Sequence, residues 1–330
     1  MRLIAFAIAG VLASAGIGSA QEWKPERITL IVPWAAGGST DQVTRVAAAE
    51  IEAALGATVV VENQPGASGS IGTKNALEAN DGGLTWTAGA AQDLGTYKVT
   101  GMLDTSIEDW HLYLDVANVA VVGVNADAPW QDFGELIAAM KAEPGAITVA
   151  TAGVTSSGHT AMETIRALTG VEYKHVTYDG GGPAVIATVS GETQVTTQLA
   201  VEQAEMIRAG RIRPLAVLND EALEIEGVDP IPPITEWAPE FEAAPNYFGI
   251  FVPPSAPDEV VAALDAVWAD KIANSEALNN YATERGAVFA PYYGEEAQKR
   301  VAPAVANNAW LMFDGGKATV DPSTVGIPRP

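Results

Sequence analysis

The chain has 330 residues, of which 48% are hydrophobic and 18% charged, a composition typical of folded proteins rather than disordered or fibrous ones. Its 18 basic and 41 acidic residues give a net charge of −23, which argues against nucleic acid or an anionic membrane surface as a partner. The absence of cysteine excludes disulfides, thiolate nucleophiles and cysteine-ligated metals. The length predicts about two domains.

The first twenty residues have the three-part layout of a secretory signal peptide. A cationic start at Arg2 is followed by an apolar run from Leu3 to Ala13 and then by small residues that end at Ala20. The apolar run is shorter than the roughly 20 residues that a membrane span requires. We therefore expect export, cleavage after Ala20 and a soluble periplasmic protein.

From residue 28 onward, short apolar strands alternate with amphipathic helices. The pattern predicts strands at 28–32, 58–61, 84–88, 119–124, 147–151, 174–177, 194–198, 214–218 and 247–252. It predicts helices at 41–55, 71–79, 133–141 and 158–168, others between the later strands, and a mostly helical stretch over 257–312. The Pro-rich residues 321–330 are predicted to be an extended tail. The alternation predicts an α/β fold in which mostly parallel sheets are flanked by helices.

The predicted elements divide into two similar lobes. A Pro-rich, weakly periodic stretch at 229–245 has the composition of a connection, and we expect the chain to cross near Asn125 and to return near Asn246. The first lobe would then hold residues 21–124 and 246–330, and the second residues 125–245. Because ligands in open α/β sheets lie beyond the carboxyl ends of strands, this division predicts a binding cleft between the lobes.

Four loops rich in glycine and hydroxyl residues follow predicted strands and lead into helices. They are residues 33–41, 63–70, 153–158 and 178–183. Glycine lets backbone amides approach a ligand, and a helix N-terminus favours negative charge. Any one of these loops could be a plain β–α turn, but four together predict a site for a carboxylate or a phosphate.

Motifs that would indicate nucleotide binding, hydrolysis or metal binding are absent or incomplete. There is no GxxxxGK[ST] nucleotide loop and no GxSxG nucleophile elbow, and residues 66–72 read GASGSIG rather than GxGxxG. His159 and Glu163 are four residues apart on a predicted helix, but no third metal ligand accompanies them, so we expect no metal and no cofactor. A secreted serine hydrolase using Ser156 or Ser157 stays open, although no triad base is evident.

Several motifs resemble one known family. The runs IVPWAAGGSTDQVTR, VVVENQPGASGSIGT, TAGVTSSGHTAMETI, HVTYDGGGPAV and IRAGRIRPLAVL resemble, in order and spacing, solute-binding proteins of the tripartite tricarboxylate transporters, the TctC or Bug family. The resemblance covers essentially the whole chain after residue 20. It implies a two-lobed type II periplasmic-binding-protein architecture and the capture, without catalysis, of a small carboxylate for delivery to a two-subunit membrane permease. We expect a monomer. A ligand-binding co-sensor for a membrane kinase is an alternative with the same ligand chemistry.

The resemblance also implies which residues hold the ligand. One carboxylate would lie against Trp34, Ala35, Ala36, Gly38 and Ser39 of the first loop and against Ala67, Ser68, Gly69 and Ser70 of the second. The distal part of the ligand would meet Thr155, Ser156, Ser157, Tyr178 and Gln198. Asp41 is expected to cap its helix, whereas His159 could either pack against its helix or touch the ligand.

Two departures from the family pattern affect this expectation. Residues 81–85 read DGGLT where the family usually shows DGYTL, so a ring that often packs there is missing. Gln198 stands where the family has an acid, and a neutral amide cannot pair with a substrate amine. We therefore expect a ligand without an amino group, a di- or hydroxycarboxylate of four to six carbons.

Overall fold

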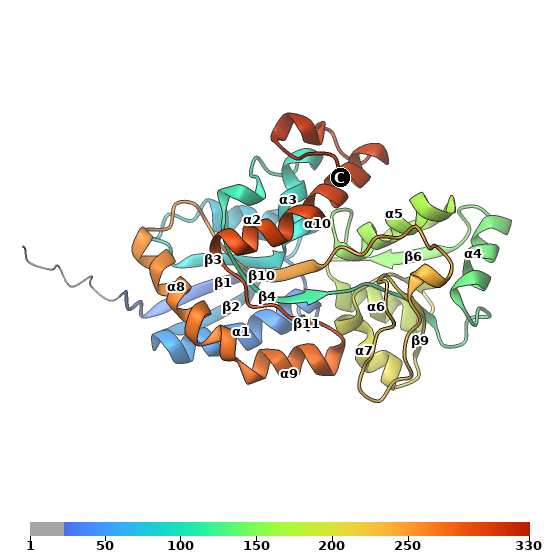
Figure 1. Cartoon of the computed structure of the whole chain (residues 1–330), viewed down its shortest axis with the longest axis horizontal. Coiled ribbons are helices and arrows are strands. Elements are labelled where there is room, and N and C mark those ends of the chain that lie inside the picture. Colours follow the sequence, from blue (N-terminus) through green and yellow to red (C-terminus); the bar gives the residue numbers. More distant parts are fainter. Residues whose placement is uncertain (1–22) are drawn as a thin grey trace, which may run out of the picture.

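The computed structural model describes residues 23–330 and has two lobes (Figure 1). The predicted signal peptide lies outside the described residues. Within them, no helix combines the length and the apolar character that crossing a membrane requires.

A six-stranded sheet in the order β11-β4-β10-β3-β1-β2 forms the first lobe. Its strands are β1 (Arg27–Val32), β2 (Thr58–Asn63), β3 (Thr85–Ala90), β4 (His111–Asn118), β10 (Asn246–Val252) and β11 (Val288–Phe289). The helices that cover it are α1 (Ser39–Leu55), α2 (Ser70–Leu77), α3 (Ala91–Thr100), α8 (Asp258–Asp270), α9 (Glu276–Arg285) and α10 (Gly294–Asp314). Helices α1, α8 and α9 pack on one face and α2, α3 and α10 on the other (Figure 1), so both faces are buried.

A five-stranded sheet in the order β7-β6-β8-β5-β9 forms the second lobe. Its strands are β5 (Val121–Asn125), β6 (Thr148–Thr151), β7 (Lys174–Thr177), β8 (Val195–Thr196) and β9 (Ile212–Val217). Its helices are α4 (Phe133–Ala142), α5 (Ser157–Thr169), α6 (Gly181–Ser190) and α7 (Ala200–Arg208). Short 3-10 helices occur at Ala67–Gly69, Ile107–Asp109, Ile234–Glu236, Ile272–Asn274 and Pro322–Val325.

The α/β architecture is as expected, but the strand directions are mixed. The pairs β1–β2, β1–β3, β6–β7 and β6–β8 are parallel. The strands next to the crossings pair antiparallel: β10 with β3 and β4, and β5 with β8 and β9. A chain that enters the neighbouring lobe directly from a strand, without a crossover helix, can pair in this antiparallel way.

The first crossing lies earlier in the chain than expected. β5 belongs to the second sheet, so the chain passes between the lobes at Val119 and Ala120 rather than near Asn125. The return leads into β10 at Asn246, the position expected. The predicted strand at 119–124 was correct as a strand, but alternation along a strand does not reveal which sheet it joins.

The C-terminal residues fold back rather than extend. Trp310 in α10 donates a hydrogen bond from Nε1 to the carbonyl oxygen of Pro328 at 2.9 Å. The guanidinium of Arg329 lies 3.9 Å from the Trp310 ring centroid and pairs with Asp314 at 2.9 Å. These contacts hold the tail against α10, so its proline content does not leave it extended in solvent.

Candidate functional site

The first predicted loop, residues 33–38, is braced by Asp41 in the first turn of α1. Asp41 Oδ2 accepts a hydrogen bond from Gly37 N at 2.9 Å, and its Oδ1 accepts from Arg45 Nε and Asn63 Nδ2, both at 2.9 Å. Burial alone would raise the pKa of Asp41, but these hydrogen bonds hold it below its usual value. Asp41 therefore fixes the loop that precedes its helix. It does not cap the helix as expected, because the N-cap residue is Gly38 and the amide that Asp41 binds, that of Gly37, lies before the helix.

The second predicted loop has a strained backbone. Ala67, Ser68 and Gly69 have φ angles of 45°, 54° and 87°, in the left-handed region that non-glycine residues rarely adopt. A Cβ atom at Gly69 would lie 2.6 Å from the Tyr97 hydroxyl and 3.0 Å from the Trp34 ring, so only glycine fits. Strain of this kind clusters at binding sites, where the surrounding structure over-determines it.

The loops of the two lobes contact each other directly. Ser68 Oγ accepts a hydrogen bond from Val154 N, and the Ser68 carbonyl accepts one from Thr155 Oγ1, each at 3.1 Å. Ala35 N donates to the Asp179 carbonyl at 2.8 Å. The sequence placed these loops at the mouth of a cleft, and in this structure the cleft is closed.

A small cavity lies between the closed lobes, and five helices begin at it. Its volume is about 20 Å³, room for about one water molecule. Each of the five helices contributes residues at or near its first turn. These are Ser39 and Thr40 of α1, Asp93 of α3, Ser156 and Ser157 at the start of α5, Gly181 of α6, and Leu199 and Glu202 at the start of α7. Because each helix start carries partial positive charge, their convergence favours a bound anion.

The structure brings together part of the predicted site. Trp34, Gly38, Ser39, Ser156, Ser157 and Gln198 line the cavity, whereas Ala35, Ser68 and Thr155 form the contact between the lobes. Ala36, Ala67, Gly69, Ser70 and Tyr178 do not line it. Tyr178 donates instead to Glu192 Oε1 at 2.9 Å; burial and this carboxylate raise the pKa of Tyr178 to about 12.

Glu202, which the sequence analysis did not single out, crosses from the second lobe to the first. Its Oε1 accepts from Ser39 N, the first amide of α1, at 2.9 Å, and its Oε2 accepts from Leu199 N at 3.2 Å. With its amide oriented to satisfy both ends, Gln198 donates to Glu202 Oε2 at 2.9 Å and accepts from Ala152 N at 2.7 Å. Burial raises the pKa of Glu202 despite these hydrogen bonds.

Asp93 is the second acid at the cavity. Its side chain is 6% exposed, and its Oδ1 has no hydrogen-bond partner among the described residues. Burial, assisted by the charge of Glu202, raises the pKa of Asp93 well above its usual value, although Gln92 and Ser157 partly offset the rise. The expectation of a ligand without an amino group assumed a cleft that lacks an acid, and these two carboxyl groups remove that premise.

Neither acid carries an unusual sequence signal. An acidic residue at the third position of a helix is an ordinary stabiliser of the helix N-terminus, and both acids occupy that position in their helices. The sequence analysis also assigned no helix to residues 91–100. The informative clue would have been that both helices follow strands closely, α3 after β3 and α7 after β8, as the helices after the Gly-rich loops do.

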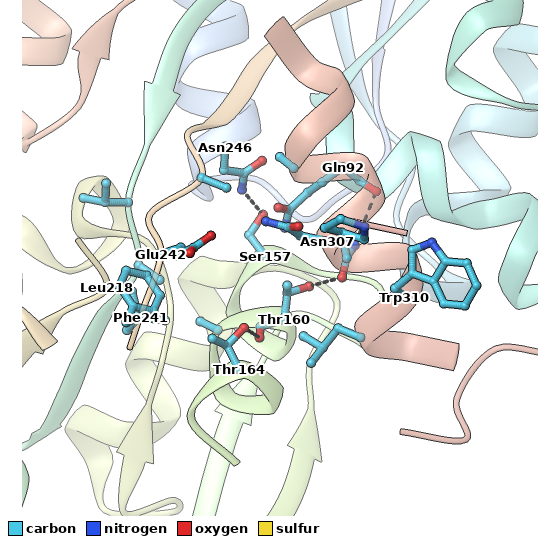
Figure 2. A pocket seen from close by; sticks show the side chains of 18 of the residues that line it. Gln92, Ser157, Thr160, Thr164, Leu218, Phe241, Glu242, Asn246, Asn307 and Trp310 are labelled. Carbon is cyan, nitrogen blue, oxygen red and sulfur yellow. Dashed lines mark hydrogen bonds between the residues drawn. The ribbon is translucent and has the colours of Figure 1, made fainter. Parts of the chain in front are cut away.

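The two serines considered as nucleophiles have structural partners. Ser156 caps α5: its Oγ accepts from His159 N at 3.3 Å and donates to the Gly153 carbonyl at 2.8 Å. Ser157 Oγ accepts a hydrogen bond from Asn246 at 2.6 Å (Figure 2). No histidine ring in the described part of the chain hydrogen-bonds to either hydroxyl, so no serine–base pair of a hydrolase is assembled there.

His159 is a buried packing residue. Its ring stacks on His175 with centroids 4.3 Å apart and planes 5° apart, and its Nδ1 lies 2.6 Å from the Val154 carbonyl. Glu163 lies 3.7 Å from His159 but binds Arg166 at 2.8 Å and accepts from Tyr173 at 2.7 Å. Within residues 23–330, no cluster of three or more metal-ligating side chains forms.

A larger cavity of about 440 Å³ lies beside the crossings (Figure 2). It is lined by the crossing segments, α5, α10 and the C-terminal tail, and it meets the smaller cavity at Ser157 and Leu199. Thr160 Oγ1 donates to Asn308 Oδ1 across it at 2.7 Å, tying α5 to α10. Apart from Ser157, none of the predicted ligand-binding residues lines this cavity, so we place the candidate site at the smaller one.

Residues 43–304 match the model of the tripartite tricarboxylate transporter family receptor. Protein BugT of Bordetella pertussis is 31% identical over 269 residues, which cover 78% of this chain and 81% of BugT.

Solved structures share the fold. One described as a periplasmic transporter is 26% identical with a TM-score of 0.79, covering 88% of this chain and 97% of its own. The periplasmic binding protein BugD is 23% identical with a TM-score of 0.79, covering 88% of this chain and 98% of its own. The family match covers most of the chain, and it agrees with the two lobes and with the closed cleft lined by helix starts. The chain therefore belongs to the TctC (Bug) family of solute-binding receptors of tripartite tricarboxylate transporters.

Proposed function

We propose that this protein is a periplasmic receptor that captures a di- or hydroxycarboxylate of four to six carbons and delivers it, as a monomer, to a two-subunit membrane permease. The observation that carries the proposal is the convergence of five helix N-termini on one cavity between the lobes. Family membership supports the transport role. The signal-peptide layout of residues 1–20 supports export, which N-terminal sequencing of the periplasmic protein would test.

Dipoles and short hydrogen bonds can provide the affinity without a cationic side chain. A helix N-terminus contributes roughly 0.3–1 kcal/mol to an anion, and up to about 2 kcal/mol when partly buried. A hydrogen bond to a charged group contributes roughly 1.5–3 kcal/mol. A few such contacts reach about −8 kcal/mol, which corresponds to micromolar affinity. The short range of these forces suits a protein whose net charge of −23 repels anions at a distance.

Ligand entry requires the lobes to open. The closed cavity has room for about one water molecule, far less than a dicarboxylate occupies, so the closed state must relax to admit one. The segments at Val119–Ala120 and next to Asn246 are the natural hinges, because the chain passes between the sheets there. A ligand that contacts both lobes would shift the population towards closure, producing the surface that a permease could recognise.

The proposal is tested by calorimetric titration with succinate, malate, glutarate, adipate and citrate, with thermal shift as a screen. At least one C4–C6 acid should bind with micromolar or tighter affinity, and X-ray scattering should show a smaller radius of gyration at saturation. Methyl esters of the same acids serve as the control, because they keep the carbon skeleton and lose the charge. If no acid binds, or if the esters bind equally well, the carboxylate assignment is wrong.

A further inference from the structure

Asp93 is a buried acid with no cation beside it. It is 6% exposed, and it lines both the small cavity between the lobes and a second small cavity inside the first lobe. None of the residues that line either cavity, all of them within 23–330, is a lysine, an arginine or a histidine. An ionised carboxylate is costly to bury without a cation, so a carboxyl group in such surroundings holds a proton instead.

Glu202 determines which of the two acids at the cavity is ionised. Its oxygens accept hydrogen bonds from two backbone amides, those of Ser39 and Leu199, and from the side chain of Gln198. Asp93 Oδ1, by contrast, has no partner among the described residues. Hydrogen bonds donated to a carboxylate stabilise its charge, and that charge opposes ionisation of a second acid nearby. The negative charge therefore belongs on Glu202 and the proton on Asp93.

The other groups around Asp93 do not reverse this assignment. The start of α3 favours an ionised Asp93, and so do hydrogen bonds from Gln92 and Ser157. Burial and the charge of Glu202 outweigh them and raise the pKa of Asp93 well above its usual value. Tyr97, the remaining titratable residue along the two cavities, is neutral because burial raises its pKa. At neutral pH, Asp93 is therefore a hydrogen-bond donor at the cleft.

We propose that Asp93 binds the ligand as a neutral carboxylic acid and donates a hydrogen bond from its O–H group to a ligand carboxylate. Resting on the function proposed above, this adds a residue that was not among those predicted to hold the ligand. The Ser39 amide, the donor at the start of α1, is already bound to Glu202, so a ligand carboxylate needs a further donor. An O–H···O⁻ hydrogen bond is short and charge-assisted, and the buried side chains of Trp34 and Phe248 exclude water from it, which strengthens it.

A neutral Asp93 also explains how a site with two acids can hold an anion. One negative charge, that of Glu202, then faces the ligand instead of two, and Asp93 attracts the ligand carboxylate rather than repelling it. Asp93 lies in the first lobe and Glu202 in the second, so the two acids come together when the lobes close. The proton on Asp93 is therefore favoured most in the closed state that encloses the ligand.

Two substitutions at Asp93 distinguish a neutral acid from an ionised one. Asp93→Asn keeps an uncharged donor, so in calorimetric titrations it should bind the preferred C4–C6 acid within about threefold of the wild type. Asp93→Leu removes the donor and should weaken binding about tenfold or more, the range of a hydrogen bond to a charged group. Asp104→Leu is the matched control, because Asp104 lies in the same lobe with a side chain 93% exposed and should leave the affinity unchanged. Melting temperatures establish that each variant folds.

Carbon-13 NMR of protein labelled at its aspartate carboxyl carbons observes the proton directly. The wild type, saturated with the preferred acid at pH 7, should show a carboxyl signal at the position of a protonated acid, and Asp93→Asn should remove it. Asp115 provides an internal reference, because it is fully buried and burial raises its pKa well above the usual value. Its protonated signal should persist in Asp93→Asn.

Each contrary result has a defined meaning. If Asp93→Asn weakens binding as much as Asp93→Leu, or if it removes no protonated signal, Asp93 is ionised in the complex, and this inference fails while the proposed function stands. If Asp93→Leu binds the acid as tightly as the wild type, Asp93 does not hold the ligand, and again only this inference fails. If no C4–C6 acid binds the wild type, the proposed function fails and the role of Asp93 fails with it.

Discussion

Glu202 Oε1 lies 2.9 Å from the amide nitrogen of Ser39, although 163 residues separate the two in sequence. The contact joins the first turn of α7 in one lobe to the start of α1 in the other. A carboxylate of the protein thus occupies a position where a helix N-terminus stabilises negative charge. The hydrogen bond between Glu202 and Ser39 therefore makes closure of the cleft depend on one acidic side chain.

Gly181 should be essential for this contact. A Cβ atom there would overlap the Glu202 carboxylate, so Gly181→Ala should displace Glu202 from Ser39 and lower the free energy of unfolding by about 1–3 kcal/mol. X-ray scattering should show a larger radius of gyration for the unliganded variant. Gly182→Ala is the control, because its Cβ would make an ordinary contact at 3.4 Å. Adding Glu202→Ala to Gly181→Ala should remove the overlap and recover the free energy of unfolding that Gly181→Ala loses. Equal destabilisation by Gly181→Ala and Gly182→Ala would contradict the argument.

Thr155 should contribute to closure and not to the stability of its own lobe. Thr155→Val keeps the shape of the side chain but removes the hydrogen bond to the Ser68 carbonyl across the cleft. The closed state should lose about 0.5–1.5 kcal/mol, which weakens ligand binding about two- to tenfold in a calorimetric titration. Thr197→Val removes a hydrogen bond to Gly158 within the second lobe, so it should lower the melting temperature and leave affinity unchanged.

The stacked histidines should make the protein acid-sensitive. Burial, followed by the neighbouring His159, lowers the pKa of His175 to about 4, and burial also lowers the pKa of His159 despite nearby Glu163. In the unfolded chain both titrate near 6.5. As the pH falls from about 6.5 towards 4, the unfolded state therefore takes up protons that the folded state does not.

The free energy of unfolding should then fall by up to about 1.4 kcal/mol per pH unit for each histidine. Urea unfolding at several pH values between 7.5 and 4.5 measures this slope. His175→Gln should reduce it, and an identical slope in the variant would exclude the histidine pair as its origin.

Asp41 should affect stability at a lower pH than the two histidines do. Its folded-state pKa lies below the usual value of 3.8, so its stabilising effect is present above pH 3.8 and is lost as the pH falls through the lower, folded-state value. Asp41→Asn should lower the melting temperature at pH 7 by a few degrees, because the hydrogen bonds from Gly37 and Arg45 weaken. The difference from the wild type should shrink as the pH falls below 3.8, and a constant difference would show that charge is not involved.

Local patterns were sufficient for much of the fold. Strands such as β1 and β2, the Gly-rich turns after them and the helix starting near Asp41 were all predicted, because alternation, glycine and capping residues act over a few neighbouring positions. The same patterns failed for β4 and α3. Nearly every residue of these two elements is buried, so neither shows a polar face that would identify its type.

The sequence by itself determined an acidic chain without cysteine, an α/β fold in two lobes, and loops whose amides suit an anion, because composition and turn chemistry are local properties. Only the tertiary structure decided that Asp93 and Glu202 face one cavity and that Tyr178 turns towards Glu192 instead. Only it placed the first crossing at Val119 and Ala120. These relationships depend on how the two lobes dock. Docking buries carboxyl groups near each other that lie far apart in the sequence, so no spacing along the chain predicts it.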